Sequence, residues 1–335
     1  FFEQRGNSCS RPPTAEQYLN RHFYSSENTA RDIDEIRKSL GLQKISVYGV
    51  SYGTIPAHLY SALFKDSTRA VVLEGVIFKS DDLTLIENPR RRKILQSFFN
   101  SLPANMQLRI LEVSQQSGIS PHWFSNVGQW MLYLDHPIKT YRNFLDNILW
   151  NDDSLGSLLS SFEEGPLQDP DFGFSQVMMN MLACQELGMN SANTGFYSVF
   201  SGSKLVAETN SSLREKHCAP LGFQSNEVAT IFKASEHPLS VPVTYFQGTL
   251  DGATAAPQAV HSFKKAALGP AQLILVKKGG HTPLLGALSS GFESGPAIDL
   301  RKKVLSSALQ GQDLSPSLLQ ELSSATELGW QRIQK

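Results

Sequence analysis

The sequence has few cysteines, almost no net charge and no long hydrophobic run. Its three cysteines are too few and too scattered for a cysteine-ligated zinc site or a disulfide-dense scaffold. A formal net charge of −1 argues against nucleic acid or an anionic membrane as a partner. No apolar run approaches the ~20 residues that span a bilayer. We therefore expect a globular protein with no nucleic-acid partner and no membrane span.

The 335 residues, 41% of them hydrophobic, are enough for a full core and a sizeable insertion. Two of the cysteines, Cys184 and Cys218, could form one disulfide or remain buried thiols. The sequence therefore leaves the compartment open between cytoplasmic and secreted.

A Gly-x-Ser-x-Gly motif occupies residues 49–53, between a predicted strand and a predicted helix. The β-branched and aromatic run 44–48 predicts a buried strand, and the apolar spacing of residues 56–64 predicts a helix. A strand that turns into a helix over one serine is typical of a nucleophile elbow, whose tight turn needs very small residues two positions either side of the serine. We therefore predict that Ser51 is a nucleophile rather than an inert serine in a glycine turn.

An acid and a histidine follow the serine in the order that an elbow predicts. Asp251 lies just after the predicted strand 241–248, and His281 lies on a glycine-rich loop after the predicted strand 272–276. The carboxyl ends of parallel strands meet at one edge of a sheet, where such folds keep their chemistry. His281 would take the proton of Ser51, and Asp251 would fix the imidazole tautomer and stabilise its charged form.

Other histidines and acids fit these roles less well. One rival for the acid is Glu74, because it ends the predicted strand 69–73, a position from which some hydrolases supply their acid. The alternative is that Glu74 only binds nearby backbone, and Asp251 is preferred for its loop. Packing or surface roles suit His58, His122, His136 and His237, and His261 follows the acid loop in a helical stretch.

Four segments carry a pattern that occurs together in one group of enzymes. Residues 1–8 are similar to an Asp-Gln-Arg-Gly-x-Gly-x-Ser segment, residues 29–41 to the helix before the elbow, residues 49–54 to Gly-x-Ser-Tyr-Gly-Thr, and residues 248–254 to an acid loop. In these segments the chain resembles the prolyl aminopeptidase and tripeptidyl aminopeptidase branch of the α/β-hydrolases, which are serine peptidases.

The resemblance implies an α/β-hydrolase fold, in which helices flank a mostly parallel sheet and a helical cap is inserted. We predict the first part of the core at residues 1–77, the cap at 78–238 and the second part of the core at 239–335. The roughly 160 residues between the two parts lack alternating strand patterns, which favours a helical insertion.

The resemblance also implies a serine exopeptidase that removes residues from peptide N-termini through an acyl-enzyme on Ser51. The backbone N–H of Tyr52 would hold the oxyanion, and no metal or organic cofactor is expected. Glu186, in a stretch similar to the branch's Cys-x-acid segment, would bind the substrate's α-ammonium group; the alternative is an ordinary surface or capping glutamate. Two other functions stay open, an esterase or amide hydrolase of small acyl compounds and a non-catalytic hydrolase-fold binding protein.

The chain also departs from the pattern of the branch. It has no loop like His-Gly-Gly-Pro-Gly, whose backbone supplies a second oxyanion donor in the branch, and the residues Phe1-Phe2 resemble the tail of a strand. We therefore expect a missing N-terminal segment or companion chain that supplies the first strands and this donor. Without it, we expect the chain to be poorly soluble or nearly inactive.

Overall fold

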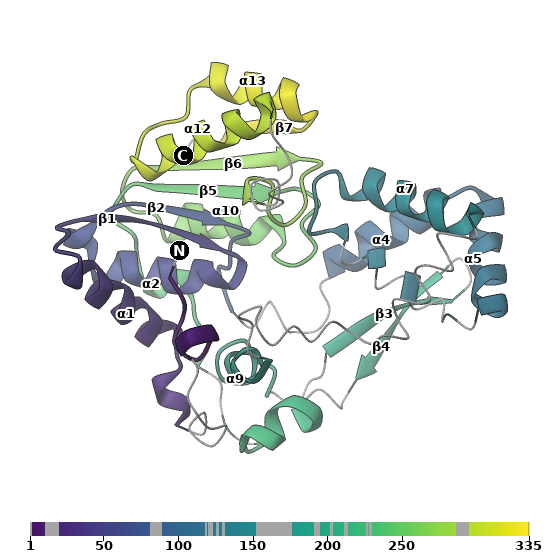
Figure 1. Cartoon of the computed structure of the whole chain (residues 1–335), viewed down its shortest axis with the longest axis horizontal. Helices are drawn as coiled ribbons and strands as arrows, with labels where there is room; N and C mark the ends of the chain where they lie inside the picture. The colour runs from purple at the N-terminus through teal and green to yellow at the C-terminus, as the bar shows by residue number, and fades with distance from the viewer. Residues whose placement is uncertain are drawn as a thin grey trace.

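The sheet at the centre of the molecule is mostly parallel. The computed structural model describes residues 2–10, 20–80, 89–117, 119, 123–124, 127–128, 131–151, 176–190, 195–201, 204–210, 214–225, 227, 230–285, 295–333 and 335. Within these ranges, five strands pair in the order β1-β2-β5-β6-β7 (Figure 1). Four of them are parallel to one another, namely β1 (Ile45–Val50), β2 (Thr68–Glu74), β5 (Val243–Gly248) and β6 (Ala271–Lys277). The fifth, β7 (Gly329–Ile333), pairs antiparallel with β6.

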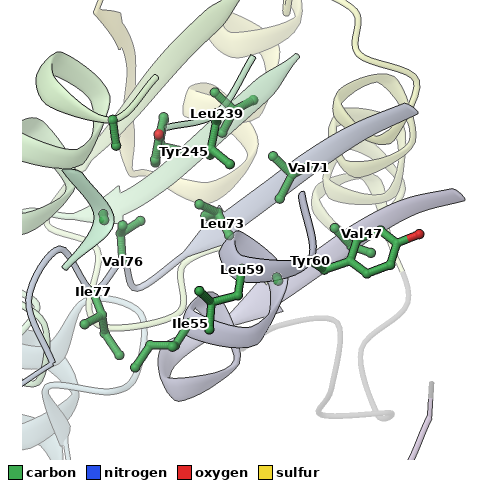
Figure 2. Close-up of a cluster of buried hydrophobic side chains, with 14 of the residues drawn as sticks. Val47, Ile55, Leu59, Tyr60, Val71, Leu73, Val76, Ile77, Leu239 and Tyr245 are labelled. Carbon is green, nitrogen blue, oxygen red and sulfur yellow. The ribbon is translucent and has the colours of Figure 1, made fainter. Parts of the chain in front are cut away.

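The central strands are apolar because both faces of the sheet are covered. Alternate residues of β2 point to opposite faces, so Leu73 and Val72 enter different hydrophobic clusters. The cluster around Leu73 includes side chains from α1 (Ser26–Ser39), α2 (Thr54–Leu63) and α10 (Ala256–Lys265), and Figure 2 shows several of its residues, among them Ile55 and Tyr245. The cluster around Val72 includes side chains from α12 (Pro296–Leu309) and α13 (Pro316–Thr326).

The insertion, by which we mean the described residues between β2 and β5, has its own apolar core. Residues Phe99, Ile110 and Tyr141 belong to one buried cluster. The described part of the insertion includes the helices α4 (Pro89–Ser101), α5 (Ala104–Ser117), α7 (Pro137–Trp150) and α9 (Gln176–Gln185). Figure 1 shows β5 and β6 pointing toward the side on which α4, α5 and α7 lie.

The insertion also includes a pair of strands that the sequence did not predict. Strands β3 (Gly195–Ser201) and β4 (Lys204–Asn210) pair antiparallel in a separate two-stranded sheet. The described part of the insertion is therefore not purely helical. Short helical turns complete the described elements; the 3₁₀ turns are Ser8–Ser10, Arg21–Phe23, Ser51–Gly53, Lys65–Ser67, Ala219–Leu221 and Ala234–Glu236, and a π-helical turn is Arg214–Cys218.

The first residues do not continue a strand. Phe1 lies outside the described residues, and Phe2 is 42% exposed and belongs to no strand, so the strand tail predicted there is wrong for Phe2. A polar Gln4 follows it, whose amide donates to the hydroxyl of Thr29 on α1 at 3.0 Å. In the described sheet β1 is an edge strand. None of the described helices is long and apolar enough to cross a membrane.

Candidate active site

Ser51 lies in the turn between β1 and α2 with a strained backbone. Its φ is +54°, in the left-handed region that residues other than glycine rarely adopt. A Cβ on Gly49 would lie 2.3 Å from the carbonyl oxygen of Gly53 and 2.7 Å from the Cβ of Ala57, so the strand can meet the helix this closely only with glycine at position 49. The Thr54 hydroxyl donates to the Ser51 carbonyl at 2.7 Å and so ties the turn to the first residue of α2.

The second glycine of the motif is under no such constraint. Gly53 has a φ of −58°, and a Cβ placed on it would meet no heavy atom within 4 Å. The expected requirement for a very small residue two positions either side of Ser51 therefore has a steric basis at Gly49 alone.

Asp251 is fully buried and accepts hydrogen bonds from every side. One carboxylate oxygen, Oδ1, accepts from the backbone N–H groups of Ala253 and Thr254, both at 2.8 Å. The other, Oδ2, accepts from the Gln247 amide at 2.6 Å and from the Thr254 hydroxyl at 2.7 Å. Oδ2 also lies 2.9 Å from Nδ1 of His281. These donors fix the carboxylate in one orientation and stabilise its charge in a buried place.

His281 is also buried, with 1% of its surface exposed. Its Nδ1 faces Asp251, and its Nε2 has no hydrogen-bond partner among the described residues. The structure thus brings Asp251 and His281 together, whereas the described hydrogen bonds include none between His281 and Ser51. The ring rests on the end of β2, because a Cβ on Gly75 would lie 2.7 Å from its Cε1.

A segment of the insertion lies directly on the histidine loop. We call residues 131–135 the strap. The backbone N–H of His281 donates to the carbonyl of Leu132 at 2.9 Å, and the ring of Tyr133 meets the His281 ring edge-on at 4.8 Å between centroids. Arg301 of α12 holds the strap from the other side, since it pairs with Asp135 at 2.5 Å and donates to the carbonyl of Pro283 at 3.2 Å. The insertion and the core therefore meet at His281.

Glu74 ends β2 and is fully buried, but no hydrogen bond joins it to the ring of His281. Its carboxylate accepts from the Tyr48 hydroxyl on β1 and from the backbone N–H groups of Leu284, at 2.5 Å, and Leu285, at 3.2 Å. Burial raises the pKa of Glu74 to about 7, while these hydrogen bonds and the nearby charge of His281 act in the opposite direction. The alternative role considered from the sequence, binding to nearby backbone, describes these contacts.

Glu186 follows α9 and faces the start of α1. It is 5% exposed, and its carboxylate accepts from the backbone N–H of Ser26 at 2.8 Å and from the Ser26 hydroxyl. The same hydroxyl lies 2.7 Å from the phenol oxygen of Tyr52, the residue after Ser51. Burial raises the pKa of Glu186. The backbone of Tyr52 belongs to the elbow, and its phenol contacts Ser26, which in turn binds the Glu186 carboxylate. Tyr52 therefore links the elbow to Glu186.

Cys184 and Cys218 form a disulfide, with 5.6 Å between their Cα atoms, and Cys9 is exposed as a free thiol. The bridge joins α9 to the Arg214–Cys218 turn, one residue before Gln185 and two before Glu186. Of the two states left open from the sequence, the paired one is therefore present.

His58, His136 and His261 have partners other than Asp251 and His281. His58, buried on α2, faces the carbonyl of His237 at 2.7 Å, and burial lowers its pKa to about 4. His136 faces the carbonyl of Thr326 at 2.8 Å, and His261 packs against Phe78. His122 lies outside the described residues. In the described part of the chain, no group of three or more His, Cys, Asp or Glu side chains could hold a metal ion.

Several contacts of the site carry no signal in the sequence. Gln247 and the Thr254 hydroxyl lie next to recognisable residues of the acid loop, but their donation to Asp251 depends on how the loop bends. The strap comes from a part of the chain without a clear pattern. Glu74 could be found as the last residue of an apolar strand, and a buried carboxylate at such a strand end is itself the signal.

Comparison with known proteins gives the class of this fold. Residues 1–108 match a family model described as alpha/beta hydrolase fold. This segment contains β1, the elbow, α2 and β2, and the rest of the parallel sheet continues the same architecture. The chain has the α/β-hydrolase fold.

The sequence is also similar to named enzymes over short stretches. It is 45% identical to a tripeptidyl aminopeptidase of Streptomyces lividans over 58 residues, which are 17% of this chain and 11% of that protein. It is 36% identical to the serine protease Hip1 of Mycobacterium tuberculosis H37Rv over 78 residues, 23% of this chain and 15% of that protein. The matches thus span far less than two thirds of these relatives. A structural match to a marine microorganism esterase covers 84% of this chain and 77% of the esterase chain, at 15% sequence identity and a TM-score of 0.33.

Proposed function

We propose that the protein is a serine hydrolase whose catalytic residues are Ser51, His281 and Asp251. The observation that carries the proposal is the buried Asp251–His281 pair, 2.9 Å apart, on loops at the carboxyl ends of β5 and β6, in a chain whose elbow holds Ser51 at positive φ. The Asp251 contact requires a proton on Nδ1 of His281, which leaves Nε2 as the basic nitrogen. A histidine in this state can act as the general base for a serine.

In the proposed reaction, Ser51 Oγ attacks an acyl carbonyl while His281 Nε2 takes its proton. The oxyanion would be held by the Tyr52 backbone N–H, which is at the start of a helical turn and has no partner within that turn. His281 would then protonate the leaving group and activate water to release the acyl group. A second oxyanion donor belongs, in this proposal, to a segment or chain additional to these 335 residues.

For the substrate we propose a peptide with a free N-terminus. Two observations support an aminopeptidase over an esterase. The partial matches include a protein named tripeptidyl aminopeptidase, and a buried carboxylate, Glu186, is joined through Ser26 to the tyrosine that follows Ser51. A carboxylate is the natural partner of an α-ammonium group. In the present structure Ser26 occupies this carboxylate, so a bound amine would have to replace or share those two hydrogen bonds.

Labelling with a fluorophosphonate tests the nucleophile. We expect one labelled serine in the wild-type protein and none in Ser51→Ala. Ser61→Ala is the matched control, because Ser61 is buried on α2 but donates to the Ala57 carbonyl at 2.9 Å. Equal labelling of wild type and Ser51→Ala would refute the assignment. An unlabelled wild type would favour the non-catalytic binding protein instead.

A panel of aminoacyl, tripeptidyl and acyl-ester reporters then tests the substrate class. Glu186→Gln should lower turnover of free-amine peptides by about tenfold, the factor that one charge-assisted interaction is worth, and leave simple esters unaffected. N-acetylated versions of the same peptides serve as controls and should be poor substrates for both proteins. Equal loss on peptides and esters would assign Glu186 a structural role, and faster turnover of esters by the wild type would favour the esterase.

A further inference from the structure

Four backbone groups of residues 281–285 are hydrogen-bonded to other described parts of the chain, and two of them donate to one buried carboxylate. His281 N–H is bound by the strap and the Pro283 carbonyl by Arg301. The next two backbone N–H groups, of Leu284 and Leu285, both donate to Glu74. The loop therefore depends on Glu74 for its position after His281.

The end of β2 also touches the histidine ring. Glu74 is followed by Gly75, which has a φ of +61°. A Cβ on Gly75 would lie 2.7 Å from Cε1 of the His281 ring, so the backbone of Gly75 packs directly against the ring. The positive charge of His281 lowers the pKa of Glu74, which means that the carboxylate and the imidazole attract each other. A charged Glu74 therefore attracts the positive charge that His281 gains when it takes a proton from Ser51.

We propose that Glu74 is a second carboxylate of the site, a positioning residue that anchors the 281–285 loop and stabilises the charged form of His281. This inference rests on the proposed function for its catalytic consequence. The two carboxylates would have different roles. Asp251 orients the imidazole ring through Nδ1, whereas Glu74 holds the backbone of residues 284–285 and places a negative charge near His281. Tyr48 completes the arrangement, since its hydroxyl donates to Glu74 from the neighbouring strand.

The ionisation of Glu74 makes this role visible in a pH profile. The pKa of Glu74 is raised to about 7, because burial outweighs the hydrogen bonds from Tyr48 and the 284–285 backbone, which act to lower it. The groups that face Glu74 are Tyr48 from β1, the backbone of residues 284–285 and His281. Glu74 gains its charge as the pH rises through 7, so part of the rise in Ser51 reactivity should follow this ionisation.

The closing experiment measures the rate of fluorophosphonate labelling of Ser51 against pH. Tyr48→Phe should shift the rise to higher pH, because Glu74 loses a donor that stabilises its charge. Glu74→Gln should remove this component and lower the rate at pH 8 by about tenfold, which corresponds to a loss of about 1.4 kcal/mol of transition-state stabilisation. Tyr48→Phe should then cause no shift in the Glu74→Gln background. The control is Asp34→Asn, which removes a buried carboxylate of α1 that pairs with Arg37 and should leave the midpoint unchanged.

Hydrogen exchange of the Leu284 and Leu285 amides tests the anchor without any need for activity. Glu74→Leu should speed their exchange by about tenfold, as expected for the loss of a hydrogen bond to a charged acceptor. Glu74→Gln keeps an acceptor oxygen and should preserve most of the protection. If the amides exchange faster in Glu74→Leu but the wild-type protein is not labelled by fluorophosphonate, the anchoring role of Glu74 holds and the proposed function fails. Unchanged exchange in Glu74→Leu, or a Tyr48→Phe shift that persists without Glu74, would overturn the inference.

Discussion

Gly75 and His281 are in such close contact that no side chain fits between them. A Cβ on Gly75 would lie 2.7 Å from Cε1 and 2.9 Å from Nδ1 of the imidazole. The Nδ1 atom is also the one that meets Asp251. The backbone of Gly75 therefore packs against one side of the imidazole ring and limits where the ring can lie when it contacts Asp251.

Gly75→Ala should displace the ring and lower Ser51 labelling by roughly a hundredfold, since a shift of about 1 Å in a catalytic group can cost that much. The substitution also forces a side chain into left-handed backbone, at a cost of about 1–2 kcal/mol. Gly41→Ala separates the two effects, because Gly41 has a φ of +66° but no atom within 4 Å of its Cβ position. Similar loss of stability with full labelling is expected there, and full labelling of Gly75→Ala would disprove the close fit.

The two glycines of the elbow should respond differently to alanine. Gly49→Ala places a methyl group against the Gly53 carbonyl and Ala57, so we expect a loss of about 1–3 kcal/mol, typical of overpacking, together with loss of labelling at Ser51. Gly53→Ala meets no neighbour within 4 Å and should keep both stability and labelling. Chemical denaturation and labelling of the two variants decide the point. Equal damage from both would mean that the elbow is packed more tightly around Gly53 than the structure describes.

Glu74 should make the protein less stable as the pH rises from about 4.5 to about 7. Its pKa is about 7 in the folded state against 4.5 ordinarily, so in this window the folded protein holds a proton that the unfolded chain has lost. The free energy of unfolding then falls with rising pH, by on the order of 3 kcal/mol from this group. Glu74→Gln should remove that part of the decline. Denaturant titrations of both proteins across the window measure it, and parallel curves would contradict the prediction.

The Cys184–Cys218 bridge closes a stretch of 34 residues in sequence separation. Loop-closure entropy predicts about 4 kcal/mol of stabilisation for a loop of this size. Replacing both cysteines by alanine should lower the melting temperature by several degrees and leave labelling of Ser51 intact at temperatures where the variant is folded. Melting curves with and without reductant provide the check, since the variant should not respond to reductant. Loss of labelling in the folded variant would give the bridge a direct part in the site.

The core of the fold was predictable because its strands are buried on both faces. Runs such as 70–73 and 273–276 are apolar without interruption, so these strands and their order along the chain could be predicted directly. The α/β-hydrolase fold, which the elbow motif and the family resemblance implied, is confirmed. The edge strand β7 was missed because it is short and only partly buried, with Trp330 as its one deeply buried residue.

The surroundings of the candidate site were less predictable for a different reason. The contacts of His281 with Leu132 and Tyr133 join residues about 150 positions apart, and those of Glu74 with Leu284 join residues 210 apart. Such pairs leave no local pattern, because they depend on how loops bend after the strands have been placed. Gly75 is a further example, because the need for glycine at this position comes from the ring of His281, which lies on a loop far away in the sequence.

The hydrogen bond from His281 to the Leu132 carbonyl gives the strap a consequence for kinetics. A substrate that contacts the insertion and displaces the strap by a fraction of an ångström would also displace the backbone of His281, the proposed general base. Good and poor substrates of such an enzyme should then differ in kcat more than in KM, because discrimination would occur after binding. The insertion would select substrates by how well they align the base, and not only by how tightly they are held.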